Sequence, residues 1–490
     1  MDRSQALEHG SIPGLLWKFS LPAIVGMMAQ ALYNIVDRIF VGRALGPDGI
    51  AGTTVAFPAM LVLLALGMLV GFGATALISI RLGQRNHDGA ERVLGNAVVL
   101  LFIVSLIATL AGLWFLNPLL RIFGASDRVL PYARDYLGII VLGTTFQIVG
   151  FGLNAAIRGE GNPRIAMLTM LIGVLLNVVL APLFVFGLGW GMKGAALATV
   201  LSQAVSATWV LAYFLGGRSV LKLRKRNLHL DWAVCLAILA IGSPPFAMQI
   251  AGSVMNSVLN NQLKAHGGDL AISVMGIVYA LIMMIAMPIF GINQGAQPII
   301  GYNYGAAKLD RVKRTLLTAI LAASCLTVMG FVVTMLFSVQ VVRLFSRGDP
   351  ELVALGSHAL RICTIFLPLV GFQIVSAGYF QAVGKPKHAM LLMLSRQIFL
   401  LIPAILILPL FFGLDGTWAA MPTADLGSSL LTGVCLFLEL RHLDRGKPHS
   451  LAREPALAAD ARAQGLVACS HSPSGVQSAL AEPAHGEIES

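Results

Sequence analysis

Residues 50–78 read IAGTTVAFPAMLVLLALGMLVGFGATALI and contain no charged side chain. A helix needs about 20 apolar residues to cross the hydrocarbon core of a bilayer, so this run is long enough. About twelve such runs recur, near residues 14–40, 50–78, 93–116, 134–157, 165–187, 193–215, 233–262, 271–300, 316–340, 357–382, 389–412 and 416–440. The runs are continuous rather than alternating, which favours helices over barrel strands. We therefore predict an all-α integral membrane protein with about twelve transmembrane helices.

Composition supports the same class. Of the 490 residues, 57% are hydrophobic and 12% are charged, whereas soluble domains have roughly 45 to 50% and about 25%. The net charge of +11 comes from Lys and Arg that gather in alternate loops, at residues 81–92, 218–226 and 308–314. This pattern is typical of membrane topology and not of a nucleic-acid surface. We expect these loops and both termini to face the cytoplasm of a bacterial inner (plasma) membrane.

The second half of the chain repeats the first with an offset of 222 or 223 residues. Gly83 recurs as Gly305, and the tetrapeptide FQIV at 146–149 recurs at 372–375. Each unit has six helices, an even number, so both units enter the membrane from the same side as parallel repeats. We predict two six-helix lobes around a central cavity. Their boundaries are predicted at 1–217 and 232–445, with an inter-lobe linker at 218–231 and a disordered cytoplasmic tail at 446–490.

One acidic residue stands well inside the first apolar run. Asp37 shares a helical face with Gln30 and Asn34 by their spacing. An ionisable group inside a membrane span is expensive and is a functional candidate by default. A carboxylate among amide and hydroxyl oxygens can hold a proton or a sodium ion. The alternative is an interfacial Asp37 that pairs with its neighbour Arg38.

Other polar side chains inside the runs are weaker candidates, because Ser, Thr, Asn and Gln also serve as packing groups between helices. Asn177 and Thr199 would add oxygens near Asp37. Asn260 occupies the repeat position of Asp37, so the second lobe lacks that acid. The candidates for substrate contact are Gln30, Tyr33, Gln203, Gln249, Asn256, Asn260 and Gln294.

Arg396 and Asp425 are the remaining charged residues inside spans, and they could neutralise each other. A structural ion pair is the first interpretation, with a gating role as the alternative. Pro22 in the first run removes a backbone donor and can act as a kink or hinge.

The sequence offers little enzymatic machinery. The five cysteines lack metal-ligand spacing, and the glycine-rich stretch at 378–385 departs from a phosphate loop, with Pro386 where Ser or Thr would bind magnesium. We expect neither an enzyme nor a cofactor, apart from a coupling ion, H⁺ or Na⁺.

Several motifs together are similar to those of the multidrug and toxic compound extrusion (MATE) family. They are LYNIVDRIFVG at 32–42, NVVLAPLF at 177–184, GAALAT at 194–199 and QPIIGYNYG at 297–305. The resemblance implies a proton- or sodium-coupled antiporter that exports amphipathic, often cationic compounds by alternating access. It also implies a cation site of Asp37, Asn177 and Thr199, with Pro22 at a bend. One departure is Ala181, where family members commonly carry an acid.

Three alternatives stay open. A related flippase for lipid-linked saccharides would need a more cationic cavity, an integral-membrane enzyme would need clustered Asp, Glu or His, and an uncoupled or inactive paralogue would fit Ala181. The partners that we expect are amphipathic small molecules and the lipid bilayer, with no nucleic acid, and a monomer as the functional unit.

Overall fold

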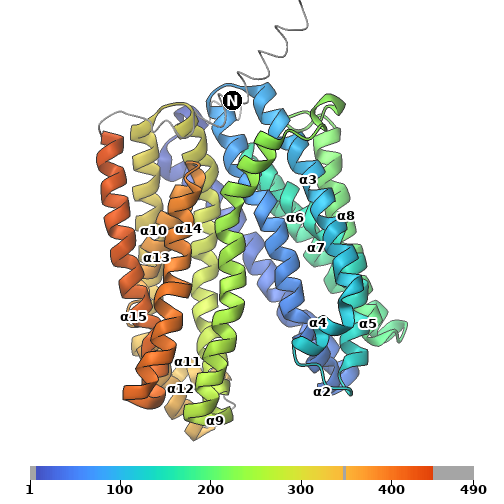
Figure 1. Cartoon of the computed structure of the whole chain (residues 1–490), viewed down its shortest axis with the longest axis vertical. Coiled ribbons are helices and arrows are strands. Elements are labelled where there is room, and N and C mark those ends of the chain that lie inside the picture. The colour runs from blue at the N-terminus through green and yellow to red at the C-terminus, as the bar shows by residue number, and fades with distance from the viewer. Residues whose placement is uncertain (1–6, 346–348, 445–490) are drawn as a thin grey trace, which may run out of the picture.

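The structure is a computed structural model that describes residues 7–345 and 349–444, and helices make up almost all of this part (Figure 1). No strand occurs within these two ranges, which confirms the predicted all-α class. The predicted tail at 446–490 lies outside the described residues.

The helices divide between two halves of the chain. The first half contains α2 (Ile12–Gly83), α3 (His87–Trp114), α4 (Leu116–Ile122), α5 (Leu130–Leu142), α6 (Thr144–Gly159), α7 (Pro163–Pro182), η1 (Leu183–Gly187) and α8 (Gly191–Leu215). After the short η2 (Lys225–Asn227), the second half contains α9 (Trp232–Gly305), α10 (Leu309–Leu336), α11 (Ser338–Phe345), α12 (Pro350–Cys363), α13 (Leu367–Ala382), α14 (Pro386–Leu394), η3 (Ser395–Leu401) and α15 (Ile402–Asp444).

The longest helices, α2 and α9, are each two membrane helices joined at one glycine. The backbone leaves the helical region at Gly46 (φ 66°, ψ −155°) and at Gly268 (φ 64°, ψ −158°). Only glycine adopts this conformation without strain. Gly46 and Gly268 are 222 residues apart, so the sequence repeat extends to the backbone of the turn.

The number of spans agrees with the prediction once the bends are considered. Nine helices in the described part are long and apolar enough to cross a membrane, or eleven if the two bent pairs α5 with α6 and α12 with α13 each count as one span. The stretch Pro386–Arg441 counts there as one helix of 56 residues, but its backbone breaks at Gly413 (φ 57°). Division at this break gives twelve.

The spans predicted as continuous at 134–157 and 357–382 are in fact bent, by 54° and 50°. In the first, the break falls at Gly143, where a Cβ would lie 2.4 Å from the Val200 side chain of α8. The close approach of α8, which local hydrophobicity does not encode, therefore accompanies the bend.

The two halves meet at the end of the bundle that carries Leu7 and the basic loops, here called the basic end. A Cβ on Gly83 would lie 1.9 Å from the carbonyl oxygen of Tyr302, and one on Gly305 would lie 2.1 Å from that of Ile80. The two contacts are equivalent under the 222-residue repeat. Backbone therefore packs directly on backbone between α2 and α9, and these positions have no room for a side chain.

At the opposite end, here called the distal end, the halves diverge (Figure 1). One buried cluster there contains only residues of the first half, such as Tyr136, and another contains only residues of the second half, such as Trp418. At the basic end, by contrast, Ile78 shares a cluster with Ile238 and Tyr302. The molecule is closed at the basic end and open toward the distal end.

The predicted linker at 218–231 packs against α3 of the first half. Glu91 pairs with Arg224, with 3.1 Å between the carboxylate and Nε, and the Asn96 side-chain oxygen accepts from the Asp231 backbone N–H at 2.7 Å. These contacts hold the linker on the first half.

Candidate functional site

Three polar side chains from α2, α7 and α8 meet inside the first half. The Asn177 amide donates to Thr199 Oγ1 at 3.1 Å, and Tyr33 Oη lies 3.1 Å from the same oxygen. Thr199 donates its single hydroxyl proton to the Ala195 carbonyl at 3.1 Å. A threonine hydroxyl has one proton and two lone pairs, so Tyr33 is the donor and Thr199 is fully engaged. The network fixes the three helices relative to one another.

Asp37 lies one turn after Tyr33 on the same face of α2, and its residue is 8% exposed. The Asp37 and Tyr33 side chains interact electrostatically. A carboxylate so deeply buried among apolar helices is costly unless it is compensated. The structure thus brings the acid next to the Tyr33, Asn177 and Thr199 network.

Ala181 is fully buried, one turn after Asn177 on α7. It presents no polar atom beyond its backbone, so the site holds one acid where the family commonly has two. Pro22 is buried, and the helix is unbroken through it. The side chain of Asn34 lies outside the described residues.

The predicted substrate residues fall in different surroundings. Gln30 and Asn260 are exposed, and Gln203 and Gln249 are half-buried. The Gln294 amide donates to the sulfur of Met27 at 3.5 Å, a contact between α9 and α2. These side chains are not gathered into one hydrogen-bonded cluster by the described contacts.

The second half has its own polar group at the equivalent place. Asn256, which is 223 residues after Tyr33, lies close to Tyr279, and Tyr279 lies close to Arg396. Arg396 Nε donates to Asp425 Oδ1 at 2.6 Å, and the Asp425 side chain is 5% exposed. The two charges that the sequence left as separate candidates therefore form one ion pair between η3 and α15.

Sequence reasoning missed another buried ion pair, near the basic end of the second half. Lys385 Nζ lies 2.7 Å from both carboxylate oxygens of Glu439, and the Tyr379 hydroxyl donates to one of them at 3.0 Å. The signal was a single acid, Glu439, near the end of the last apolar run. Nothing local to Glu439 indicates that Lys385 is its partner.

A cavity of about 410 Å³ lies between α9 and the α14–α15 region. Its lining is apolar throughout: Phe246, Ala247, Ile250, Ala251, Val254, Leu394, Ile398 and Ile402. Such a surface suits the apolar part of an amphipathic molecule or a lipid chain.

The sequence profile of the MatE family matches residues 22–183 and again residues 244–406, one match in each half. The chain is 30% identical over 433 residues to the multidrug export protein MepA of Staphylococcus haemolyticus (strain JCSC1435), which covers 88% of this chain and 93% of that protein. It is 29% identical over 415 residues to MepA of Staphylococcus aureus (strain MW2), with 84% and 91% covered.

Solved structures agree with this similarity. The structure of the MATE multidrug transporter DinF-BH superposes with a TM-score of 0.82 and 41% identity, over 87% of this chain and 96% of that chain. An outward-facing conformation of a multidrug resistance MATE family transporter superposes with a TM-score of 0.86 and 26% identity, over 90% and 99%.

Proposed function

Because this chain belongs to the MatE family, a family of membrane transporters, we propose that it is a cation-coupled antiporter that exports amphipathic, often cationic compounds. Its similarity to multidrug export proteins over most of their length supports multidrug efflux rather than enzymatic activity. The coupling ion, a proton or sodium, is part of the proposal.

The observation that carries the proposal is the buried carboxylate of Asp37 beside the Tyr33, Asn177 and Thr199 network. A buried carboxylate gains most from binding a cation or a proton, because the charge is then neutralised in a low dielectric. Coupling requires that the cation and the substrate favour different states of the carrier. Asp37 can provide that difference if cation binding and substrate binding exclude each other there.

The direction of transport follows from the charge distribution. Basic loops face the cytoplasm by the positive-inside rule, so the basic end is assigned to the cytoplasmic side and both termini with it. The distal opening then faces outward, as in the outward-facing relative. Export by alternating access requires a second state, closed at the distal end and open at the basic end.

The test is efflux of ethidium, a fluorescent lipophilic cation, from energised membrane vesicles, with proton and sodium gradients imposed separately. We expect Asp37→Asn to reduce gradient-driven efflux to the level of vesicles without the protein, since the amide cannot release and bind a proton or a cation in the same way. The matched control is Asp135→Asn on α5, an acid that is 47% exposed and 3.7 Å from Lys193. The control should transport like the wild type.

Each other outcome contradicts part of the proposal. Unchanged gradient-driven efflux by Asp37→Asn would remove Asp37 from the coupling site. Wild-type flux that ignores both gradients would indicate an uncoupled carrier, and the absence of any substrate-dependent flux would favour an inactive paralogue.

A further inference from the structure

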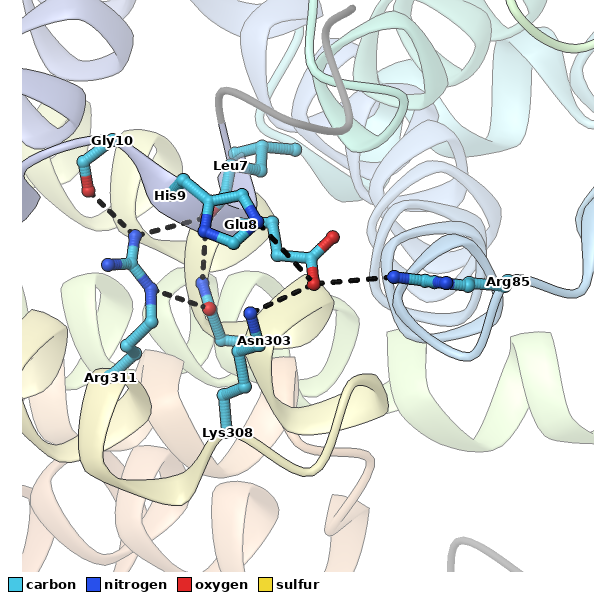
Figure 2. A network of polar contacts seen from close by, with 8 residues as sticks. All are labelled: Leu7, Glu8, His9, Gly10, Arg85, Asn303, Lys308 and Arg311. Atoms are coloured by element: carbon cyan, nitrogen blue, oxygen red, sulfur yellow. Dashed lines mark hydrogen bonds and ion pairs between the residues drawn. The ribbon is translucent and has the colours of Figure 1, made fainter.

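The segment Leu7–Gly10, here called the clasp, touches both halves of the molecule at the basic end. The Leu7 side chain is 2% exposed and belongs to the buried cluster centred on the first half. The backbone is held by the second half, because Arg311 donates to the Leu7 carbonyl at 3.1 Å and to the Gly10 carbonyl at 2.8 Å (Figure 2). Helix α2 then continues from the clasp into the first half.

The one acid of the clasp, Glu8, joins a cation from each half. Glu8 Oε1 lies 2.9 Å from Lys308 Nζ, at the start of α10, and 3.5 Å from Arg85 Nη2, just after the membrane helix that ends at Gly83 (Figure 2). His9 lies 3.9 Å from the same oxygen. The pair with Lys308 is the stronger one, because the Lys308 side chain is 31% exposed and that of Arg85 is 79% exposed.

Closure of the basic end creates the need for this acid. The loops after Gly83 and Gly305 are repeat equivalents, with positive φ at Arg85 and at Ala307. Closure brings both basic loops to one place, with Arg85 and Lys308 within 3.5 Å of one carboxylate oxygen. Like charges so close repel each other unless an acid lies between them. Lys308 in turn holds the pKa of Glu8 below its usual range, so the carboxylate is charged at neutral pH.

We propose that Glu8 is a positioning residue of the transport cycle, which fastens the two halves at the basic end while the distal end is open. Opening of the basic end then requires the Lys308 and Arg85 contacts to part. This proposal rests on the alternating access proposed above. The merely structural alternative is that Glu8 only anchors the chain end, but Arg311 already anchors the clasp through backbone carbonyls that a change at Glu8 leaves in place.

The test measures closure of the basic end by the distance between two spin labels. Arg164 and Lys387 are exposed, lie at equivalent repeat positions of the two halves and have no ion pair among the described contacts. Each would be changed to Cys in the full chain after replacement of Cys235, Cys325, Cys363, Cys435 and Cys469. The short distance reports the closed basic end, and a longer one reports its opening.

We expect Glu8→Gln to lower the ratio of closed to open molecules about fivefold, the upper range for a partly exposed ion pair. Lys308→Gln should lower it more than Arg85→Gln does. The double change Glu8→Lys with Lys308→Glu should recover part of the closed population. The control is Arg226→Gln, which removes a 3.0 Å ion pair with Asp88 within the first half and should change nothing.

A distance distribution that Glu8→Gln leaves unchanged would overturn the proposal, as would an equal effect of Arg226→Gln. The distance measurement needs no substrate and no gradient. It therefore decides the role of Glu8 whatever the efflux test of Asp37 gives, and the two proposals can fail separately.

Discussion

Gly242 of α9 offers the sharpest test of how the halves meet. A Cβ at this position would lie 1.6 Å from the carbonyl oxygen of Leu69 in α2, the closest such approach among the described glycines. Both atoms belong to helix backbones, so neither can yield without movement of a whole helix. Gly242→Ala should therefore separate the halves at this point.

The size of the effect follows from the packing. An added methyl group in a filled interior costs about 1 to 3 kcal/mol, which corresponds to a factor of roughly 5 to 150 in an equilibrium. In this case the cost falls only on the conformation that is closed at the basic end. We expect the closed population to fall by that factor, and the basic end to open.

The assay is the spin-label distance between positions 164 and 387, together with thermal unfolding in detergent. Gly276→Ala is the matched control, since a Cβ at Gly276 meets no heavy atom within 4 Å. Alanine favours a helix over glycine by roughly 1 kcal/mol, so this control should unfold at the same or a slightly higher temperature, with unchanged distances. A Gly242→Ala protein with the wild-type distance distribution would refute the argument that backbone contact closes the basic end.

Two further predictions concern buried charges and the linker. Asp425→Asn should destabilise the protein by about 3 to 5 kcal/mol, because it leaves the Arg396 guanidinium without its counter-charge, whereas the double change to Asp425→Leu and Arg396→Met should be close to neutral; chemical unfolding measures both, and equal losses in the two proteins would contradict the reasoning. Glu91→Gln should release the segment 222–226 from α3 and speed its cleavage by trypsin, while Asp310→Asn, an exposed acid of the second half, should not; equal cleavage rates would show that Glu91 does not hold the linker.

The sequence by itself determined the elements that depend on local composition. Apolar runs fixed the membrane helices, because the bilayer selects helices by length and hydrophobicity. The 222-residue repeat predicted parallel halves, and the chain shows it again in the paired turns at Gly46 and Gly268. Asp37 was identifiable because a single acid in an apolar run has few innocuous explanations.

Only the tertiary structure decided which polar groups meet. Tyr33, Asn177 and Thr199 lie on three helices, and no local pattern predicts that they share one hydroxyl. Glu8 has no apolar run or motif around it, yet it touches cations from both halves. Hydrophobicity is a property of each segment, whereas the partner of a charge depends on the packing of distant segments. For this reason the sequence predicted the helices and the acid, and the fold decided the contacts between the halves.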